Sequence, residues 1–341
     1  MLAAIAQRVA RRLISSIPAL LGVVVITFVL MRVLPGDPAV FFASGPSAGK
    51  QEIEDLRHKM GLDQPVPIQL AHYLVDIARG NLGNSLTTGQ PVVQDMRRKL
   101  PASLELTFTA LTIALLLSVP LGVLAALRPG SLIDHAVRML CTLGVCVPTF
   151  VSGLLLIYMF YYVLGWAPDP TARIDIFAST PPDITGFYLI DFALVGDWNG
   201  WWAAASQLLL PAFTMALFVL APLARMTRAS MLAVLGSDFI RTARSLGLKQ
   251  HRIIIAYALR NALLPVLTIT GIVFSTMLGA NVLVEKVFSW PGVASYALDA
   301  LLASDYAPVQ AFVLLMASIF VMVNVAIDIL YGIIDPRVSI E

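Results

Sequence analysis

The sequence predicts an all-α integral membrane protein with six transmembrane helices. Of its 341 residues, 58% are hydrophobic and only 13% are charged, about half the charged fraction of a soluble domain. The mean hydropathy of +0.82 agrees with this class. The third observation is that the apolar residues form six long runs. A net charge of +2 gives no indication of nucleic-acid binding, so no nucleic-acid partner is expected.

Each run is long enough to cross a bilayer, whose hydrocarbon core takes about 20 helical residues. Four runs contain no charge, while Arg32 lies near the end of the first and Glu105 near the start of the second. None alternates apolar and polar residues, as barrel strands of about 10 residues would. Trp290 and Tyr306, beside the last two runs, are expected to be interfacial anchors. The predicted spans are 13–34, 103–127, 139–164, 205–224, 261–284 and 306–327.

The basic residues between the spans predict the orientation, because Lys and Arg in short loops favour the cytoplasmic side. The stub 1–12 and the loop 128–138 are basic, and segment 225–260 has seven basic residues against one acid. The opposite segments, 165–204 and 285–305, have an excess of acids. Both termini, 1–12 and 328–341, are therefore expected in the cytoplasm, with membrane lipid around the spans.

The N-terminal run also has the basic start of a secretory signal. It is longer than the usual apolar stretch of about 7–15 residues, and no small-residue cleavage site follows it, so we expect it to remain as the first span. Regions 35–102 and 165–204 are rich in Pro and Gly and include short helical stretches such as 50–60. These regions are expected to be ordered external elaborations.

The chain carries no motif that could energise transport. It has no Gly-rich phosphate-binding loop, and its four histidines lack metal-ligand spacing. Cys141 and Cys146 are expected to be buried free thiols. The span centres lack the ionisable residues of ion-coupled carriers, and Asp328, near the end of the last span, is expected to pair with a neighbouring helix. We therefore expect no catalytic residue, cofactor or metal here, and an energy source in a partner.

Segment 225–260 is the most informative part of the predicted cytoplasmic side. Leu235, Phe239, Ala243 and Leu246 have the spacing of one face of a helix, and Asp238 is a favourable acid at its start. Gly247 is expected to end this helix in the left-handed conformation. A short helix, a Gly turn and a second short helix would make a compact knob. The alternative is a basic loop lying on anionic headgroups.

Several sequence patterns, taken in order, resemble the permeases of ABC importers for peptides, nickel and glycosides. Residues 241–247 (RTARSLG) are similar to the cytoplasmic coupling motif of these permeases, although Arg241 stands where Glu is usual and Leu264-Pro265 comes later than usual. Segment 185–191 is similar to the dipeptide permeases of this branch. The other similar patterns are Pro35-Gly36-Asp37-Pro38, 80–85 with 104–106, 288–292, and Asn324, Asp328, Tyr331 and Pro336-Arg337.

The resemblance implies a type I ABC importer permease fold and a subunit without enzymatic activity of its own. It implies an inner-membrane complex with a second homologous permease, two ATPases that bind ATP and Mg, and an external peptide-binding protein. The chain would contact an ATPase through residues 235–252. The residues implied at this contact are Asp238, Arg241, Thr242, Ala243, Arg244 and Gly247.

The expected substrate is a di- or oligopeptide, and nickel or another small solute is the alternative within the same superfamily. An ion-coupled carrier acting alone is the alternative from a different class. The substrate-pathway residues are not predicted.

Overall fold

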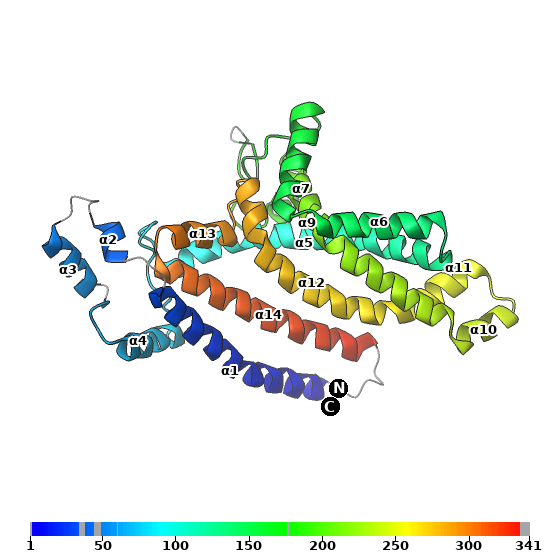
Figure 1. Ribbon diagram of the computed structural model, residues 1–341, viewed down its shortest axis with the longest axis horizontal. Coiled ribbons are helices and arrows are strands. Elements are labelled where there is room, and N and C mark those ends of the chain that lie inside the picture. Colours follow the sequence, from blue (N-terminus) through cyan, green and yellow to red (C-terminus); the bar gives the residue numbers. More distant parts are fainter. Residues whose placement is uncertain (1, 34–37, 44–48, 60, 176–177, 335–341) are drawn as a thin grey trace. The chain divides into compact units, whose positions relative to one another are not determined.

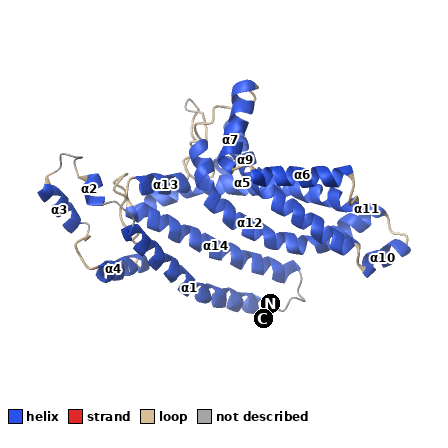
Figure 2. Ribbon diagram, in the orientation of Figure 1, coloured by secondary structure: helices blue, strands red, loops and turns tan. Residues whose placement is uncertain are grey.

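The computed structural model describes residues 2–33, 38–43, 49–59, 61–175 and 178–334. In these residues the structure is predominantly helical, and the one strand-like pairing is an isolated bridge between Asn84 and Pro91 (Figure 2). The prediction of an all-α chain is confirmed. The Pro-Gly-Asp motif at 35–37 and Pro336-Arg337 lie outside the described residues, as do the side chains of Asp328 and Tyr331.

Among the described residues, five helices are long and apolar enough to cross a membrane. They correspond to five of the six predicted spans and lie at Ala10–Val33, Val92–Leu127, Trp198–Leu235, Gln250–Gly279 and Tyr306–Ile327. A sixth crossing results if the bent pair Leu132–Gly144 and Thr149–Val163 is counted as one span. Several helices extend beyond the predicted apolar runs, because a helix can continue through polar residues once it has left the bilayer core.

The run 139–164 was predicted as one helix, and the structure divides it. Helix α6 (Leu132–Cys146) ends before Pro148, and α7 (Thr149–Leu156) starts after it and continues as the π-helical segment η1 (Ile157–Val163). The two arms are bent by 102°. Val147 is extended, with φ −91° and ψ 123°, because the proline ring disfavours helical backbone at the preceding residue.

The chain divides into two compact units, residues 1–101 with 291–322 and residues 102–290 with 323–341. In the first unit, a buried cluster joins Val92 and Met96 to Val293, Tyr296 and Ala311. Its helices are α1 (Leu2–Val33), α2 (Pro38–Phe42), α3 (Lys50–Lys59), α4 (Val66–Ala78), the start of α5 (Val92–Leu127), α13 (Val293–Leu302) and most of α14 (Tyr306–Ile334).

The second unit is built around the 38-residue helix α9 (Trp198–Leu235) (Figure 1). Its core joins three helices, and the contribution of α5 is a row of residues four apart: Ala102, Leu106, Ala110 and Ala114. Residues at this spacing share one helix face. Besides α5, α6, α7 and η1, the unit contains α8 (Tyr188–Val195), α10 (Asp238–Ser245), α11 (Gln250–Arg252), the π-helical η2 (Ile253–Leu259) and α12 (Arg260–Val287).

Helices α5 and α9 approach each other closely at Gly122. A Cβ at this position would lie 2.6 Å from Thr227 Cβ and 2.8 Å from the Ala224 carbonyl oxygen. Such distances are well inside van der Waals contact, so only glycine fits without a shift of one helix. Small residues that allow close backbone approach are the usual interface of membrane helices, and Gly122 has this role here.

Candidate coupling site and buried polar network

The predicted coupling segment is a direct extension of α9. Helix α9 continues through Leu235, and only Gly236 and Ser237 separate it from α10. On the other side, α11, η2 and α12 follow one another without a break. The segment is therefore a short helix supported between two long ones (Figure 1), and its second short helix merges into the next span.

The predicted stripe on this segment is wrong, because α10 starts three residues after Leu235 and has a different buried face. Ile240 (0% exposed) and Ala243 (6% exposed) point into the chain itself, where they pack with Met231 of α9 and Ile253 of η2. Ala243, one of the predicted ATPase-contact residues, is thus turned toward the chain itself, where its small side chain lets α10 lie close to its own unit.

The outward face of α10 carries a different set of side chains. Phe239 is 45% exposed and Leu246 is 74% exposed, and Thr242 lies between them on the same face, also exposed. Arg241 and Arg244 are exposed as well, and Arg241 Nη1 lies 3.2 Å from a carboxylate oxygen of the exposed Asp238. The segment presents an apolar strip flanked by cations.

The turn at Gly247 has the predicted left-handed conformation, with φ +72°. The Leu248 N–H donates to the Ala243 carbonyl at 3.2 Å, and the Gly247 N–H donates to the Arg244 carbonyl at 2.9 Å. These two hydrogen bonds form a Schellman motif, which satisfies the last carbonyls of the helix. Leu248 packs against the same buried cluster as Ala243, as that motif favours. The prediction of this helix end is confirmed.

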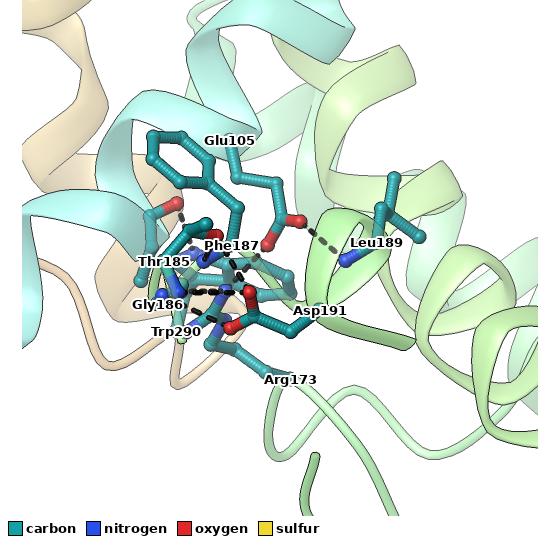
Figure 3. Close-up of polar contacts among 9 residues, drawn as sticks. Glu105, Arg173, Thr185, Gly186, Phe187, Leu189, Asp191 and Trp290 are labelled. Atoms are coloured by element: carbon teal, nitrogen blue, oxygen red, sulfur yellow. Dashed lines mark hydrogen bonds and ion pairs between the residues drawn. The ribbon is translucent and has the colours of Figure 1, made fainter. Parts of the chain in front are cut away.

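A buried ion pair joins the segment 165–187 to α5 (Figure 3). Arg173 Nη2 donates to Glu105 Oε2 at 2.5 Å and to the Gly186 carbonyl at 3.0 Å. The two side chains are only 7% and 6% exposed. The other oxygen of Glu105 accepts the N–H of Leu189 in the first turn of α8 at 2.8 Å. The guanidinium also lies 3.6 Å from the ring centre of Tyr188, within the range of a cation–π interaction.

Asp191 organises the turn that precedes α8 (Figure 3). Its carboxylate accepts the N–H and hydroxyl of Thr185, at 2.9 and 2.6 Å, and the N–H of Gly186 at 3.0 Å. The side chain is buried. The segment from 185 to 195 is thus fixed to α5 and to itself by charged hydrogen bonds, which are stronger than neutral ones.

Polar groups also join α5 to α12 and the turn after it. Ser103 Oγ donates to Glu285 Oε1 at 2.5 Å, and Asn281 Nδ2 donates to Thr107 Oγ1 at 3.0 Å. The indole N–H of Trp290 donates to the Ala102 carbonyl at 2.9 Å, and the Trp290 side chain is 2% exposed. The expectation of an interfacial anchor is therefore wrong for Trp290, which is a core residue.

The first unit has a separate polar centre at Asp305, in the turn before α14. One carboxylate oxygen accepts hydrogen bonds from the loop 85–87, the Leu86 N–H and Ser85 hydroxyl each at 2.8 Å. Asp95 accepts from the Tyr296 hydroxyl at 3.0 Å. Burial raises the pKa of Tyr296 to about 12, so this hydroxyl stays protonated and can donate at neutral pH.

Neither thiol pairs nor contributes to a metal cluster in the described structure. Cys141 and Cys146 are both free, and no group of three or more His, Cys, Asp or Glu among the described residues could hold a metal ion. Cys141 is buried as expected, whereas Cys146 is exposed at the end of α6, which corrects that part of the prediction.

Comparison with known families accounts for this combination of features. The model of the binding-protein-dependent transport system inner membrane component matches residues 118–340, and that of the N-terminal part of such membrane components matches residues 5–107. The chain belongs to this family. It is an inner-membrane permease component of an ABC importer, as the recognised motifs predicted, and not an enzyme in itself.

Other members of this permease family are similar to this chain over nearly their whole length. A di/tripeptide transport system permease protein, DppB of Pseudomonas aeruginosa, is 42% identical over 97% of this chain and 98% of its own. A probable D,D-dipeptide permease protein, DdpB of Escherichia coli, is 41% identical over 93% of both chains. The dipeptide permease protein DppB of E. coli is 38% identical over 97% of this chain and 98% of its own.

The polar network of this permease was not predicted from its sequence. Glu105 and Arg173 lie 68 positions apart in the sequence, and Ser103 and Glu285 lie 182 apart, so no local pattern connects them. The available signal was the charge itself: Glu105 stands near the start of a predicted span, where a charge is costly without a partner. That signal indicates that a partner exists, but not which one.

Proposed function

We propose that this chain imports di- or oligopeptides, as the permease subunit that forms one half of an ATP-driven translocation pathway. The observation that supports this substrate class is the 38–42% identity, over nearly the whole chain, to proteins named for dipeptide or di/tripeptide transport. Within a family of one fold, substrate preference depends on details of the pathway and of the binding protein. The proposed substrate class is therefore short peptides in general.

The proposed complex contains a second homologous permease, two ATPases and an external peptide-binding protein. ATP and Mg are bound by the ATPases in this proposal, since the present chain contains no Gly-rich phosphate-binding loop. The transport energy must then enter through a contact between the permease and an ATPase.

Helix α10 is the proposed contact with the ATPase. Its exposed apolar strip, Phe239, Thr242 and Leu246, would enter an apolar cleft with an acidic rim that suits Arg241 and Arg244. Ala243 and Gly247 act from within the chain: Ala243 lets the helix pack closely, and Gly247 fixes its end. A helix held by a buried face and a Schellman motif transmits a displacement better than a lipid-facing loop would, which supports coupling over simple attachment to headgroups.

The substrate proposal can be tested with the complete importer. Cells that carry it are expected to take up a radiolabelled dipeptide, and excess unlabelled di- and tripeptides are expected to abolish this uptake, whereas nickel does not compete. If nickel reduced this uptake and unlabelled peptides did not, the result would favour the metal-transporting alternative. Uptake that persists without the ATPase subunits and stops when the proton gradient is dissipated would indicate an ion-coupled carrier.

The proposed topology places both termini and α10 in the cytoplasm and the segment 165–204 outside. The basic residues of 225–260 and the acidic residues of 165–204 support this orientation. An alkaline phosphatase fusion after Gly196 is expected to be active, and one after Lys249 inactive, while a cytoplasmic reporter is expected to give the reverse pattern. The same response at both sites would contradict an odd number of crossings between them.

A further inference from the structure

Helix α6 is joined to the C-terminal half of α9 by an ion pair of defined geometry. Arg228 Nε lies 2.6 Å from Asp134 Oδ1, and Arg228 Nη2 lies 2.7 Å from Asp134 Oδ2. This is a bidentate pair, in which two parallel hydrogen bonds fix both the distance and the orientation of the groups. The Asp134 side chain is 1% exposed and that of Arg228 is 24% exposed, so water has little access to the carboxylate.

The same carboxylate also fixes the turn between α5 and α6. Asp134 Oδ2 accepts the Gly130 N–H at 3.0 Å, and the Asp134 N–H donates to Ser131 Oγ, which caps α6. A negative charge in the first turn of a helix is favoured by the helix dipole. Arg228 is therefore bound to a rigid helix start rather than to a mobile side chain.

Most of the other contacts described between α6 and α9 are apolar, and they run antiparallel along the pair. Val137 and Cys141 of α6 pack with Leu220, Ala221 and Ala224 of α9. Farther along, a Cβ on Gly144 would lie 3.1 Å from the Leu217 carbonyl oxygen. Apolar contacts are not directional, so they fix the register of the two helices less tightly than a bidentate ion pair does. The ion pair is therefore the contact that best resists sliding of one helix along the other.

Arg228 lies seven residues before the end of α9, which is two helical turns from the connection to α10. The connection itself is short and ordered: the Ser237 hydroxyl donates to the Val234 carbonyl at 2.5 Å, and α10 packs on Met231. A displacement of α10 would therefore move the C-terminal end of α9, and Arg228 with it, by a similar amount.

We propose that Asp134 and Arg228 are positioning residues that make α6 move together with α9 and α10, so that a displacement at α10 reaches the bend between α6 and α7. This inference rests on the proposed docking of α10 to an ATPase. Without the ion pair, α9 slides past α6, and ATP hydrolysis proceeds with less transport.

The test measures dipeptide uptake and ATP hydrolysis by the complete importer in lipid vesicles, with the binding protein present. Asp134→Asn and Arg228→Lys are both expected to lower the number of peptides transported per ATP by about fivefold or more, the low end of coupling between sites. Arg228→Lys keeps the positive charge but loses the two parallel hydrogen bonds of the guanidinium. If charge alone were needed, the ratio of peptides to ATP in this variant would be normal. The control is Arg128→Gln in the turn between α5 and α6, where the side chain is exposed, and its ratio is expected to be unchanged.

A second measurement detects the movement itself. Spin labels at Leu132 of α6 and Ala233 of α9, both exposed positions, report the distance between the two helices in a background without the native cysteines. With the ion pair intact, this distance is expected to be the same with and without ATP. In Asp134→Asn it is expected to change with ATP.

The outcomes separate this inference from the docking proposal on which it rests. A normal ratio in both variants, an equal fall in uptake and hydrolysis, or a label distance that changes with ATP in the parent importer would overturn the role of the ion pair. Normal ATPase co-purification and uptake in Phe239→Asp would instead overturn the docking of α10, because that substitution leaves Asp134 and Arg228 in place.

Discussion

Replacement of Arg173 by methionine is expected to destabilise the permease by about 3–5 kcal/mol, the usual cost of removing one partner of a buried ion pair. Glu105 would remain 5% exposed without the cation that it contacts. The segment around Gly186 would also lose the hydrogen bond from Arg173. We expect a lower melting temperature of the purified importer and a reduced amount of this subunit in membranes.

The double variant Glu105→Gln with Arg173→Met provides the matched control. A glutamine can still accept the Leu189 N–H through its carbonyl oxygen, while the unpaired charge is gone, so most of the lost stability should return. Arg128→Met, which removes an exposed cation, is expected to change stability by no more than about 0.5 kcal/mol. If Arg173→Met melts like the parent protein, the ion pair does not hold the segment to α5.

The local features of this fold could be predicted from the sequence, whereas the contacts between distant segments could not. An uninterrupted apolar run in a bilayer has few alternatives to a helix, so the spans could be predicted. The end of α10 could be predicted as well, because Gly247 follows a short polar helix. Pro148 offered a signal for the break in the third run, because proline restricts the residue before it. The pairing of Glu105 with Arg173 depends on how the chain folds back, and no local spacing records it.

The face of α10 shows how the packing partners of a short helix decide which of its residues are buried. If the helix is taken to begin at Leu235, then Phe239, Ala243 and Leu246 form one stripe. The break at Gly236 and Ser237 removes Leu235 from this helix, and the burial of Ile240 with Ala243 leaves Phe239 and Leu246 on the exposed side. Tertiary contacts with α9 and η2 decide which face of α10 is buried, and the periodicity of an eight-residue helix does not reveal these contacts.

Substitution of Gly247 by valine is expected to abolish most peptide uptake while leaving the amount of permease in the membrane unchanged. A side chain here would meet no atom within 4 Å, so the effect comes from the backbone alone. At φ +72° an L-residue is disfavoured by about 1–2 kcal/mol, and a β-branched side chain adds to this strain. Such a cost shifts a local equilibrium by a factor of about 5–30, and we expect uptake to fall by a similar factor.

Gly247→Asn is the control for this position, because asparagine adopts the left-handed conformation more readily than other non-glycine residues, and near-normal uptake is expected. Phe239→Asp complements it, since it leaves the turn intact and places a carboxylate on the exposed face of α10. If α10 is the docking element, Phe239→Asp prevents ATPase co-purification, whereas Gly247→Val leaves a weakly docked helix that has lost the hydrogen bond from Leu248 to Ala243. A basic loop lying on lipid headgroups would tolerate the strained turn, so normal uptake in Gly247→Val would mean that the conformation of this turn has no part in coupling. The two variants therefore separate the two requirements of the contact, an apolar outward face and a fixed helix end.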